Sequence, residues 1–141
     1  MDSPSRAATR SAAARPSSIV EHGHRYTVAL TWVRRHESMV TVLRRLLARI
    51  REIGLKIKRV LVDRAFFNVP VVEFLQAEKL PFLMPVVIRG RAPRPGRPLT
   101  GLRWIKRQPA GWYAYTMRSA TRQVDVSVCV NYRSYLDRKD R

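Results

Sequence analysis

Asp63 is the residue of this chain whose type and position are best suited to chemistry. It follows the apolar run Val60-Leu61-Val62 and precedes Arg64, so we expect it at the carboxyl end of a strand. Catalytic carboxylates of α/β folds are commonly held at such strand ends, where the backbone is rigid and the side chain meets the ligand. Asp63 is therefore a candidate catalytic residue and a candidate metal ligand. The alternative is structural, because an aspartate at this position often caps the following helix or forms an ion pair.

The other side chains that could bind a metal are isolated in the sequence. His22 and His24 lie two positions apart, but no third ligand is near them, so the polarity of a turn is the simpler interpretation. Cys129 is the single cysteine, which rules out a disulfide or a thiolate zinc site within one chain and fits a cytoplasmic protein. The longest apolar run, residues 80–88, is interrupted by proline and is too short for a membrane helix, so we expect no membrane span.

Hydrophobic patterning predicts the elements that would position Asp63. Alternating apolar and polar residues predict strands, and apolar residues at helical spacing between Ser38 and Gly54 predict a helix. A second helix is expected from Asn68, which can act as its N-cap, to Glu78. The expected strands are residues 18–21, 26–33, 57–62 and 80–87. Together these elements predict an α/β fold in which helices cover a mixed sheet and the crossovers are right-handed.

The charge of the chain points to a polyanionic partner. Lys and Arg number 28 against 10 Asp and Glu, which gives a formal net charge of +18. Such a field attracts nucleic acid first and a membrane surface second, because bound cations displace counterions from phosphates. Most of the excess is arginine, which favours bidentate contact with phosphate or guanine; the alternative is a proteome that uses arginine widely. Residues 1–17 are expected to form a disordered basic tail, and residues 134–141 a charged C-terminal tail.

A basic segment rich in proline and glycine follows residue 88. We expect residues 89–102 to form a loop, and we expect neither helix nor strand up to residue 107. The segment could lie along phosphates, with Trp104 stacked on an unpaired base; a solvated linker is the alternative. Two alternating runs, residues 112–117 and 124–131, predict a β-hairpin. The candidate nucleic-acid-binding residues are Arg64, Arg89, Arg91, Arg94, Arg97, Arg103, Lys106 and Arg107.

Residues 24–87 resemble the middle of a DDE transposase of bacterial or archaeal insertion sequences. The most specific parts are the strand end Val62-Asp63-Arg64-Ala65-Phe66-Phe67 and the later strand Leu80-Pro81-Phe82-Leu83-Met84-Pro85. Asp63 matches the second acidic residue of the catalytic triad of that family. The resemblance implies a partial ribonuclease-H-like core at residues 18–88 and a β-rich insertion, here a hairpin, at residues 103–133.

The resemblance also implies a metal-dependent reaction on DNA. Members of the family use three carboxylates to hold two Mg²⁺ or Mn²⁺ ions, which assist phosphodiester cleavage and strand transfer at transposon ends. Only Asp63 matches this set. The region of the first acid contains only Asp2, and the region of the third, a glutamate in the family, offers only Asp137 and Asp140. We therefore expect the central fragment of a transposase, which binds DNA and is inactive alone; the metal is expected in the full-length family rather than in this fragment.

Two functions of other classes stay open on the sequence. The first is a small, basic, non-catalytic nucleic-acid-binding protein, which needs the same positive charge but no metal. The second is a metal-dependent nuclease that completes its site with Asp125 or Asp137. Asp125 alternates with the valines of the predicted hairpin, so we expect its side chain to point outward, and this disfavours the nuclease.

Overall fold

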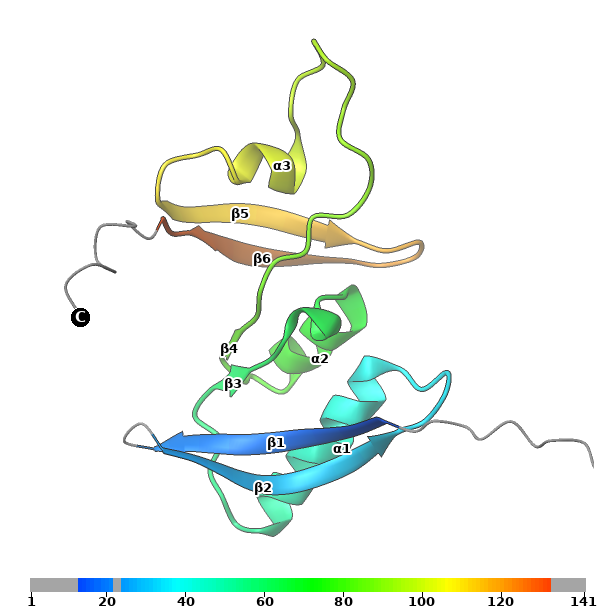
Figure 1. The fold of residues 1–141 in the computed structure, drawn as a ribbon, viewed down its shortest axis with the longest axis vertical. Helices are drawn as coiled ribbons and strands as arrows, with labels where there is room; N and C mark the ends of the chain where they lie inside the picture. The colour runs from blue at the N-terminus through cyan, green and yellow to red at the C-terminus, as the bar shows by residue number, and fades with distance from the viewer. Residues whose placement is uncertain (1–12, 22–23, 133–141) are drawn as a thin grey trace, which may run out of the picture. The chain divides into compact units, whose positions relative to one another are not determined.

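The chain has an α/β fold, as the sequence predicted (Figure 1). The computed structural model describes residues 13–21 and 24–132, with side chains from residue 28 onward. They form two compact units, which we call unit 1 (residues 1–61 and 74–82) and unit 2 (residues 62–73 and 83–141). The elements are β1 (Ala13–Glu21), β2 (His24–Val33), α1 (Met39–Glu52), β3 (Val60–Leu61), the 3₁₀ helix η1 (Arg64–Phe66), α2 (Val69–Ala77), β4 (Phe82–Leu83), α3 (Gly101–Ile105), β5 (Gly111–Arg118) and β6 (Gln123–Val130).

The strands in the described part of the chain pair two by two. β1 pairs with β2, β3 with β4 and β5 with β6, so these residues form three small sheets where one mixed sheet was expected. The ribonuclease-H-like interpretation therefore stays a prediction. The basic tail expected before residue 13, the side chains of His22 and His24, and the C-terminal tail at residues 134–141 lie outside what the structure describes.

Unit 1 contains an antiparallel hairpin with a helix packed on it. The β1–β2 register runs from Ala13 opposite Val33 to Glu21 opposite His24, and α1 packs against β2. Residues 13–17 belong to β1, so their assignment to a disordered tail was wrong. The error has a physical reason. These residues form a strand because they pair with residues 29–33, and a local composition rich in Ser, Ala and Arg does not indicate that pairing.

Helix α1 begins and ends where its capping residues predict. The Oγ of Ser38 accepts a hydrogen bond from the Thr41 amide at 3.3 Å, which satisfies one of the unpaired donors of the first turn. At the other end Gly54 has φ +84°, and the Gly54 and Leu55 amides donate back to the carbonyls of Arg51 and Ile50. This is a Schellman ending, which favours glycine at the left-handed position.

The side chain of Arg45 joins α1 to the end of β2. Its Nη1 donates to Thr31 Oγ1 at 2.9 Å and to the Trp32 carbonyl at 2.8 Å, and its Nη2 pairs with the carboxylate of Glu37. Thr31 is 7% exposed, and it is the buried polar residue among the described side chains. The side chain of Glu37 is only 11% exposed. Because buried polar groups need partners, one guanidinium holds the helix, the strand and the turn between them together.

The strands β3 and β4 flank α2 and form a short parallel pair. The Val60 amide donates to the Pro81 carbonyl at 2.8 Å, and the Val62 amide donates to the Leu83 carbonyl at 3.2 Å. Donors and acceptors advance in the same direction, which is the parallel pattern. The predicted strands at 57–62 and 80–87 were both too long. In the second, Pro81 and Pro85 carry no amide proton for the ladder. The second was also expected to be buried, whereas Leu83 is 56% exposed.

Unit 2 contains the predicted second hairpin, covered by a short helix. The β5–β6 register runs from Gly111 opposite Val130 to Arg118 opposite Gln123, which confirms the hairpin prediction. Helix α3 lies against it, so the expectation that residues 89–107 contain no helix was wrong at residues 101–105. Tertiary packing explains the helix: Ile105 is buried with Val128 and Val130, and Leu102 packs against this cluster. In the described part of the chain, no helix is both long and apolar enough to cross a membrane.

Replacing Arg45 by methionine tests the role of this guanidinium. We expect Arg45→Met to lower the free energy of unfolding by about 2 kcal/mol, because the Thr31 hydroxyl and the Glu37 carboxylate, both largely buried, lose the guanidinium that binds them. Arg49→Met is the matched control on the same helix. Its partner Glu52 and Arg49 itself are 64% and 65% exposed, so a loss below about 0.5 kcal/mol is expected. Urea unfolding measures both values, and equal losses would contradict the assignment.

Candidate nucleic-acid interface

Asp63 lies at a strand end, as the sequence predicted, and its carboxylate caps the next turn. It follows β3 and is the N-cap of η1, with φ −79° and ψ 173°. Its Oδ1 accepts a hydrogen bond from the Ala65 amide at 2.8 Å. The side chain is exposed. The structural alternative for Asp63 is therefore observed, and its role as a catalytic residue or metal ligand stays a prediction.

The described side chains do not assemble a two-metal site around Asp63. A pair of Mg²⁺ or Mn²⁺ ions needs several carboxylates around both ions. Among the residues with described side chains, no group of three or more His, Cys, Asp or Glu could hold a metal ion. Asp125 lies on the outer face of the β5–β6 hairpin, where its Oδ1 accepts a hydrogen bond from Thr116 at 2.6 Å, and Asp137 lies outside the described residues. The residues described here therefore do not fit the metal pair of the transposase family.

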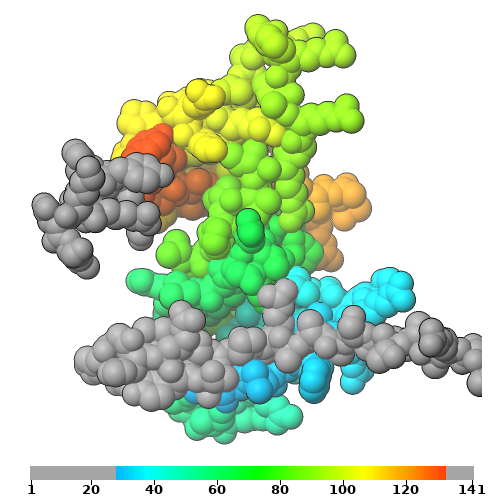
Figure 2. All heavy atoms as spheres, in the orientation of Figure 1, coloured from blue at the N-terminus to red at the C-terminus, as the bar shows by residue number. Residues whose placement is uncertain are grey.

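The arginine-rich loop, residues 89–100, has a defined tip. Arg94, Pro95, Gly96 and Arg97 form a β-turn in which the Arg97 amide donates to the Arg94 carbonyl at 3.1 Å. Gly96 has φ +82°, and proline followed by a glycine of positive φ is typical of a type II turn. Arg94 and Arg97 are both exposed at the two ends of this turn. Figure 2 shows the loop, in lime green, standing out from the surface of unit 2.

Two of the candidate binding residues hold the base of the loop. Arg89 Nη2 donates to the Phe67 carbonyl at 3.1 Å, and Arg103 Nη2 donates to the Gly90 carbonyl at 2.6 Å. A carbonyl is neutral, so each guanidinium keeps its positive charge while its position is fixed. Arginine has five N–H donors, and each of these two bonds uses one. Both residues therefore have a structural role and can still attract an anion.

The positive charge of unit 2 is poorly neutralised by its own carboxylates. No Asp or Glu occurs between Glu78 and Asp125. Within this stretch unit 2 has nine Lys and Arg: Arg89, Arg91, Arg94, Arg97, Arg103, Lys106, Arg107, Arg118 and Arg122. Among the described side chains, this stretch has one ion pair, from Arg122 to Glu73 at 3.2 Å. This absence of acids is a sequence signal that the prediction did not use, and it adds Arg118 to the candidates.

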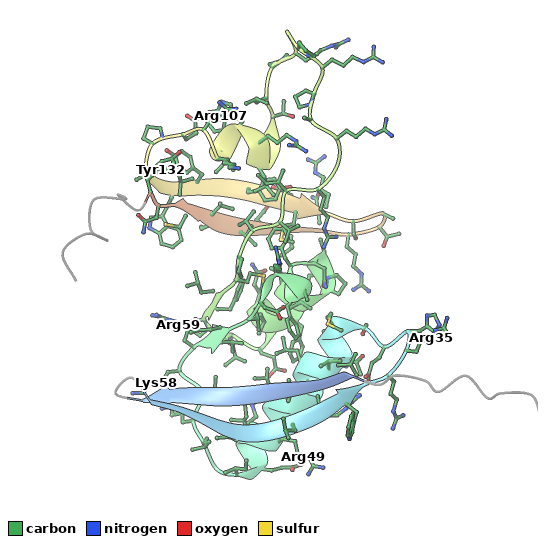
Figure 3. The ribbon with its side chains drawn as sticks, in the orientation of Figure 1. Arg35, Arg49, Lys58, Arg59, Arg107 and Tyr132 are labelled. Atoms are coloured by element: carbon green, nitrogen blue, oxygen red, sulfur yellow. The ribbon has the colours of Figure 1, made fainter. Side chains whose placement is uncertain are left out.

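The arginines of α1 contrast with those of the loop. Arg45, Arg49 and Arg51 form ion pairs, and Arg44 lies over the ring of Phe74 with its guanidinium carbon 5.2 Å from the ring centroid. Figure 3 labels exposed cations of both units, among them Arg35, Arg59 and Arg107. The arginines of α1 thus serve mainly the structure of unit 1, whereas those of the loop are available to a partner.

The remaining candidates lie on the surface of unit 2. Arg64, Lys106 and Arg107 are exposed. Trp104, the expected stacking residue, is 48% exposed and meets Tyr113 edge to face, with 6.3 Å between ring centroids. The hydroxyl of Tyr132 donates to the carbonyls of Lys106 and Gln108, which fixes the end of this basic turn (Figure 3). Trp104 is therefore held by the fold and still open to a base.

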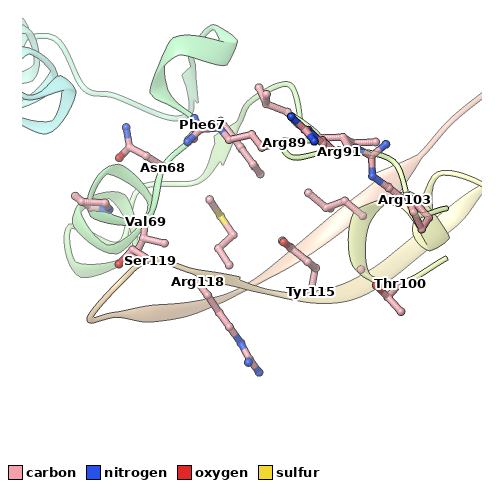
Figure 4. Close-up of a pocket in the computed structure, with 17 residues that line it drawn as sticks. Phe67, Asn68, Val69, Arg89, Arg91, Thr100, Arg103, Tyr115, Arg118 and Ser119 are labelled. Atoms are coloured by element: carbon pink, nitrogen blue, oxygen red, sulfur yellow. Dashed lines mark hydrogen bonds between the residues drawn. The ribbon is translucent and has the colours of Figure 1, made fainter. Parts of the chain in front are cut away.

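A cavity of about 590 Å³ lies within unit 2, beside the base of the loop (Figure 4). Its walls come from four segments: residues 67–70, residues 87–93, the start of α3 and the end of β5. Arg89, Arg91 and Arg103 line one side of it, and Tyr115 lines the other (Figure 4). No acidic residue lines the cavity. Sequence reasoning could not find it, because its walls are up to 52 residues apart in the chain, from Phe67 to Ser119.

Replacing Asp63 separates its capping role from its charge. Asp63→Ala should lower the free energy of unfolding by about 1 kcal/mol, because the Ala65 amide loses its acceptor. Asp63→Asn should stay within about 0.5 kcal/mol of the original chain, since asparagine caps as well as aspartate. Thermal or urea unfolding gives both numbers. Equal losses in the two variants would mean that the negative charge, and not the cap, is what stabilises this turn.

No protein-family model, curated protein or solved structure matches this chain. The resemblance to DDE transposases rests on the motifs around Asp63 and Pro81, and it stays a prediction. The surface of unit 2 is rich in arginine and has few carboxylates, and it contains a fixed β-turn and a cavity.

Proposed function

We propose that this chain binds DNA through the arginine-rich loop of unit 2, and that it is the central part of a DDE transposase without cleavage activity of its own. The observation that carries the DNA contact is the β-turn that exposes Arg94 and Arg97 within a stretch free of carboxylates. We place the protein in the cytoplasm, where it would meet DNA. The single cysteine, Cys129, fits such a reducing compartment.

Electrostatics favours a phosphate backbone as the partner of this loop. Arg91, Arg94 and Arg97 make no side-chain hydrogen bond or ion pair to the residues with described side chains. Binding to DNA would give each guanidinium a bidentate acceptor and release counterions from the duplex. The turn already holds the α-carbons of Arg94 and Arg97 within about 7 Å of each other, so less order has to be imposed on binding.

The transposase part of the proposal is supported by the order of the elements. Asp63 follows β3, the crossover helix α2 comes next, and β4 pairs parallel to β3 before the basic hairpin unit begins. A parallel pair with a helical crossover is compatible with a ribonuclease-H-like core. In this proposal Asp63 would contribute one of three carboxylates, and the other two would come from outside the described residues.

The second candidate function is a non-catalytic nucleic-acid-binding protein. It is favoured by one observation: the Asp63 carboxylate caps η1, and the described side chains contain no group of three or more His, Cys, Asp or Glu that could hold a metal ion. Both candidates use the same loop to bind nucleic acid. They differ in whether Asp63 descends from a catalytic position.

The salt dependence of DNA binding tests the contact made by the loop. Each phosphate contact contributes about 0.9 to the slope of log K against log salt concentration. We expect Arg94→Ala with Arg97→Ala to reduce that slope by about 1.8, measured by fluorescence anisotropy on a labelled duplex.

The matched control removes the same charge from unit 1. Arg35→Ala with Arg59→Ala changes two exposed arginines that lie far along the chain from the loop. This control should reduce the slope by less than about 0.5, since long-range attraction is screened by salt. Equal reductions in the two double variants would show that DNA binding follows net charge alone and would remove the loop from the proposal.

Nicking of supercoiled DNA tests the statement that the chain does not cleave alone. We expect no Mn²⁺-dependent nicking by the original chain or by Asp63→Asn, because one carboxylate cannot position two ions. DNA binding by the same samples shows that the protein is folded and competent. Nicking by the original chain that is lost in Asp63→Asn would reveal a complete catalytic site and overturn this part of the proposal.

A further inference from the structure

The cavity of unit 2 presents guanidinium groups from separate segments to one space. Arg89 and Arg91 come from the loop, and Arg103 comes from α3. They lie along the same side of the cavity in Figure 4, whereas the side chain of Arg118 extends away from it. No carboxylate lines the cavity to neutralise them. Three like charges gathered in this way repel one another, and an anion relieves that repulsion.

The fold already orders two of the arginine side chains that line this cavity. The guanidinium groups of Arg89 and Arg103 are anchored by hydrogen bonds to the carbonyls of Phe67 and Gly90, at 3.1 and 2.6 Å. Each keeps further N–H donors for a ligand, because arginine has five. Arginine side chains that are held in place lose less rotamer freedom when a phosphate binds. The two anchors therefore make this a prepared anion site.

The opposite side of the cavity offers an aromatic ring and apolar surface. Tyr115 is half-buried, packs against the cluster of Ile105, Val128 and Val130, and lies across the cavity from the arginines (Figure 4). Phe67 and Leu102 add apolar lining. The volume of about 590 Å³ falls within the range of pockets that hold small organic ligands. A ligand that fits has an anionic group at one end and a flat apolar group at the other.

We propose that this cavity binds a nucleoside phosphate, either as a free nucleotide or as the phosphorylated end of a single strand. The phosphate lies against Arg89, Arg91 and Arg103, and the base lies on the side of Tyr115. Of the loop arginines proposed to contact DNA, Arg91 also lines the cavity, whereas Arg94 and Arg97 at the loop tip do not. The two proposals can therefore fail separately.

Binding of adenosine 5′-monophosphate, followed by calorimetry, tests this site. We expect the nucleotide to bind at least about tenfold more tightly than either adenosine or inorganic phosphate, because each of these offers only one of the two groups that the cavity recognises. Comparable binding of inorganic phosphate and the nucleotide would overturn the proposal, because it would mean that the arginines bind any anion. Undetectable nucleotide binding would overturn it as well.

A pair of charge-matched variants locates the binding. Arg91→Gln should weaken nucleotide binding about tenfold, because a bidentate phosphate contact is lost. Arg35→Gln removes the same charge from an exposed residue of unit 1 that does not line the cavity, and it should change the affinity by less than about twofold. Equal effects of the two variants would place the nucleotide elsewhere. Arg94→Ala with Arg97→Ala should leave nucleotide binding unchanged whatever it does to duplex binding.

A 5′-phosphorylated trinucleotide separates the two sources of the ligand. If it competes with the mononucleotide and its unphosphorylated form does not, the cavity takes the end of a strand. If only the mononucleotide binds, the cavity takes a free nucleotide. Either result supports a nucleoside phosphate site, whereas equal competition by the phosphorylated and unphosphorylated trinucleotides contradicts it.

Discussion

The shortage of carboxylates is the constraint on which the rest of this structure depends. Every glutamate with a described side chain is paired with an arginine: Glu37 with Arg45, Glu52 with Arg49, Glu73 with Arg122 and Glu78 with Arg51. The two aspartates with described side chains bond to the Ala65 amide and the Thr116 hydroxyl. These carboxylates thus form ion pairs or hydrogen bonds within the fold. The positive charges of the loop arginines are not neutralised by them and repel one another.

The fold of unit 2 accommodates this repulsion with neutral partners. Backbone carbonyls accept hydrogen bonds from Arg89 and Arg103, and a proline-glycine β-turn fixes the backbone at the tip of the loop. Carbonyl oxygens fix a guanidinium without cancelling its charge, so the loop is ordered and remains strongly positive. Repulsion between the unpaired charges of this ordered loop lowers the free energy of unfolding. A bound polyanion would neutralise these charges and raise the free energy of unfolding again.

Local signals made part of this structure predictable. Ser38 and Gly54 set the ends of α1, and alternating residues marked the β5–β6 hairpin, because caps and alternation act over a few neighbouring positions. Features that depend on distant partners were missed. The helix α3 forms because one turn brings Leu102 and Ile105 onto the hairpin, and the cavity exists only where four segments meet. The position of Asp63 at a strand end was predicted correctly. The same sequence was compatible with two roles for Asp63, a catalytic metal ligand and a helix cap.

Covalent labelling of arginine tests most directly whether the arginines of the loop are accessible and bind DNA. A dicarbonyl reagent would be applied with and without duplex DNA, and the modified residues identified by mass spectrometry. Arg91, Arg94 and Arg97 should react readily in the free chain and be protected by DNA, while Arg45 and Arg51 should react slowly in both states because they are held in ion pairs. Protection of the α1 arginines, with the loop still reactive in the presence of DNA, would contradict this account.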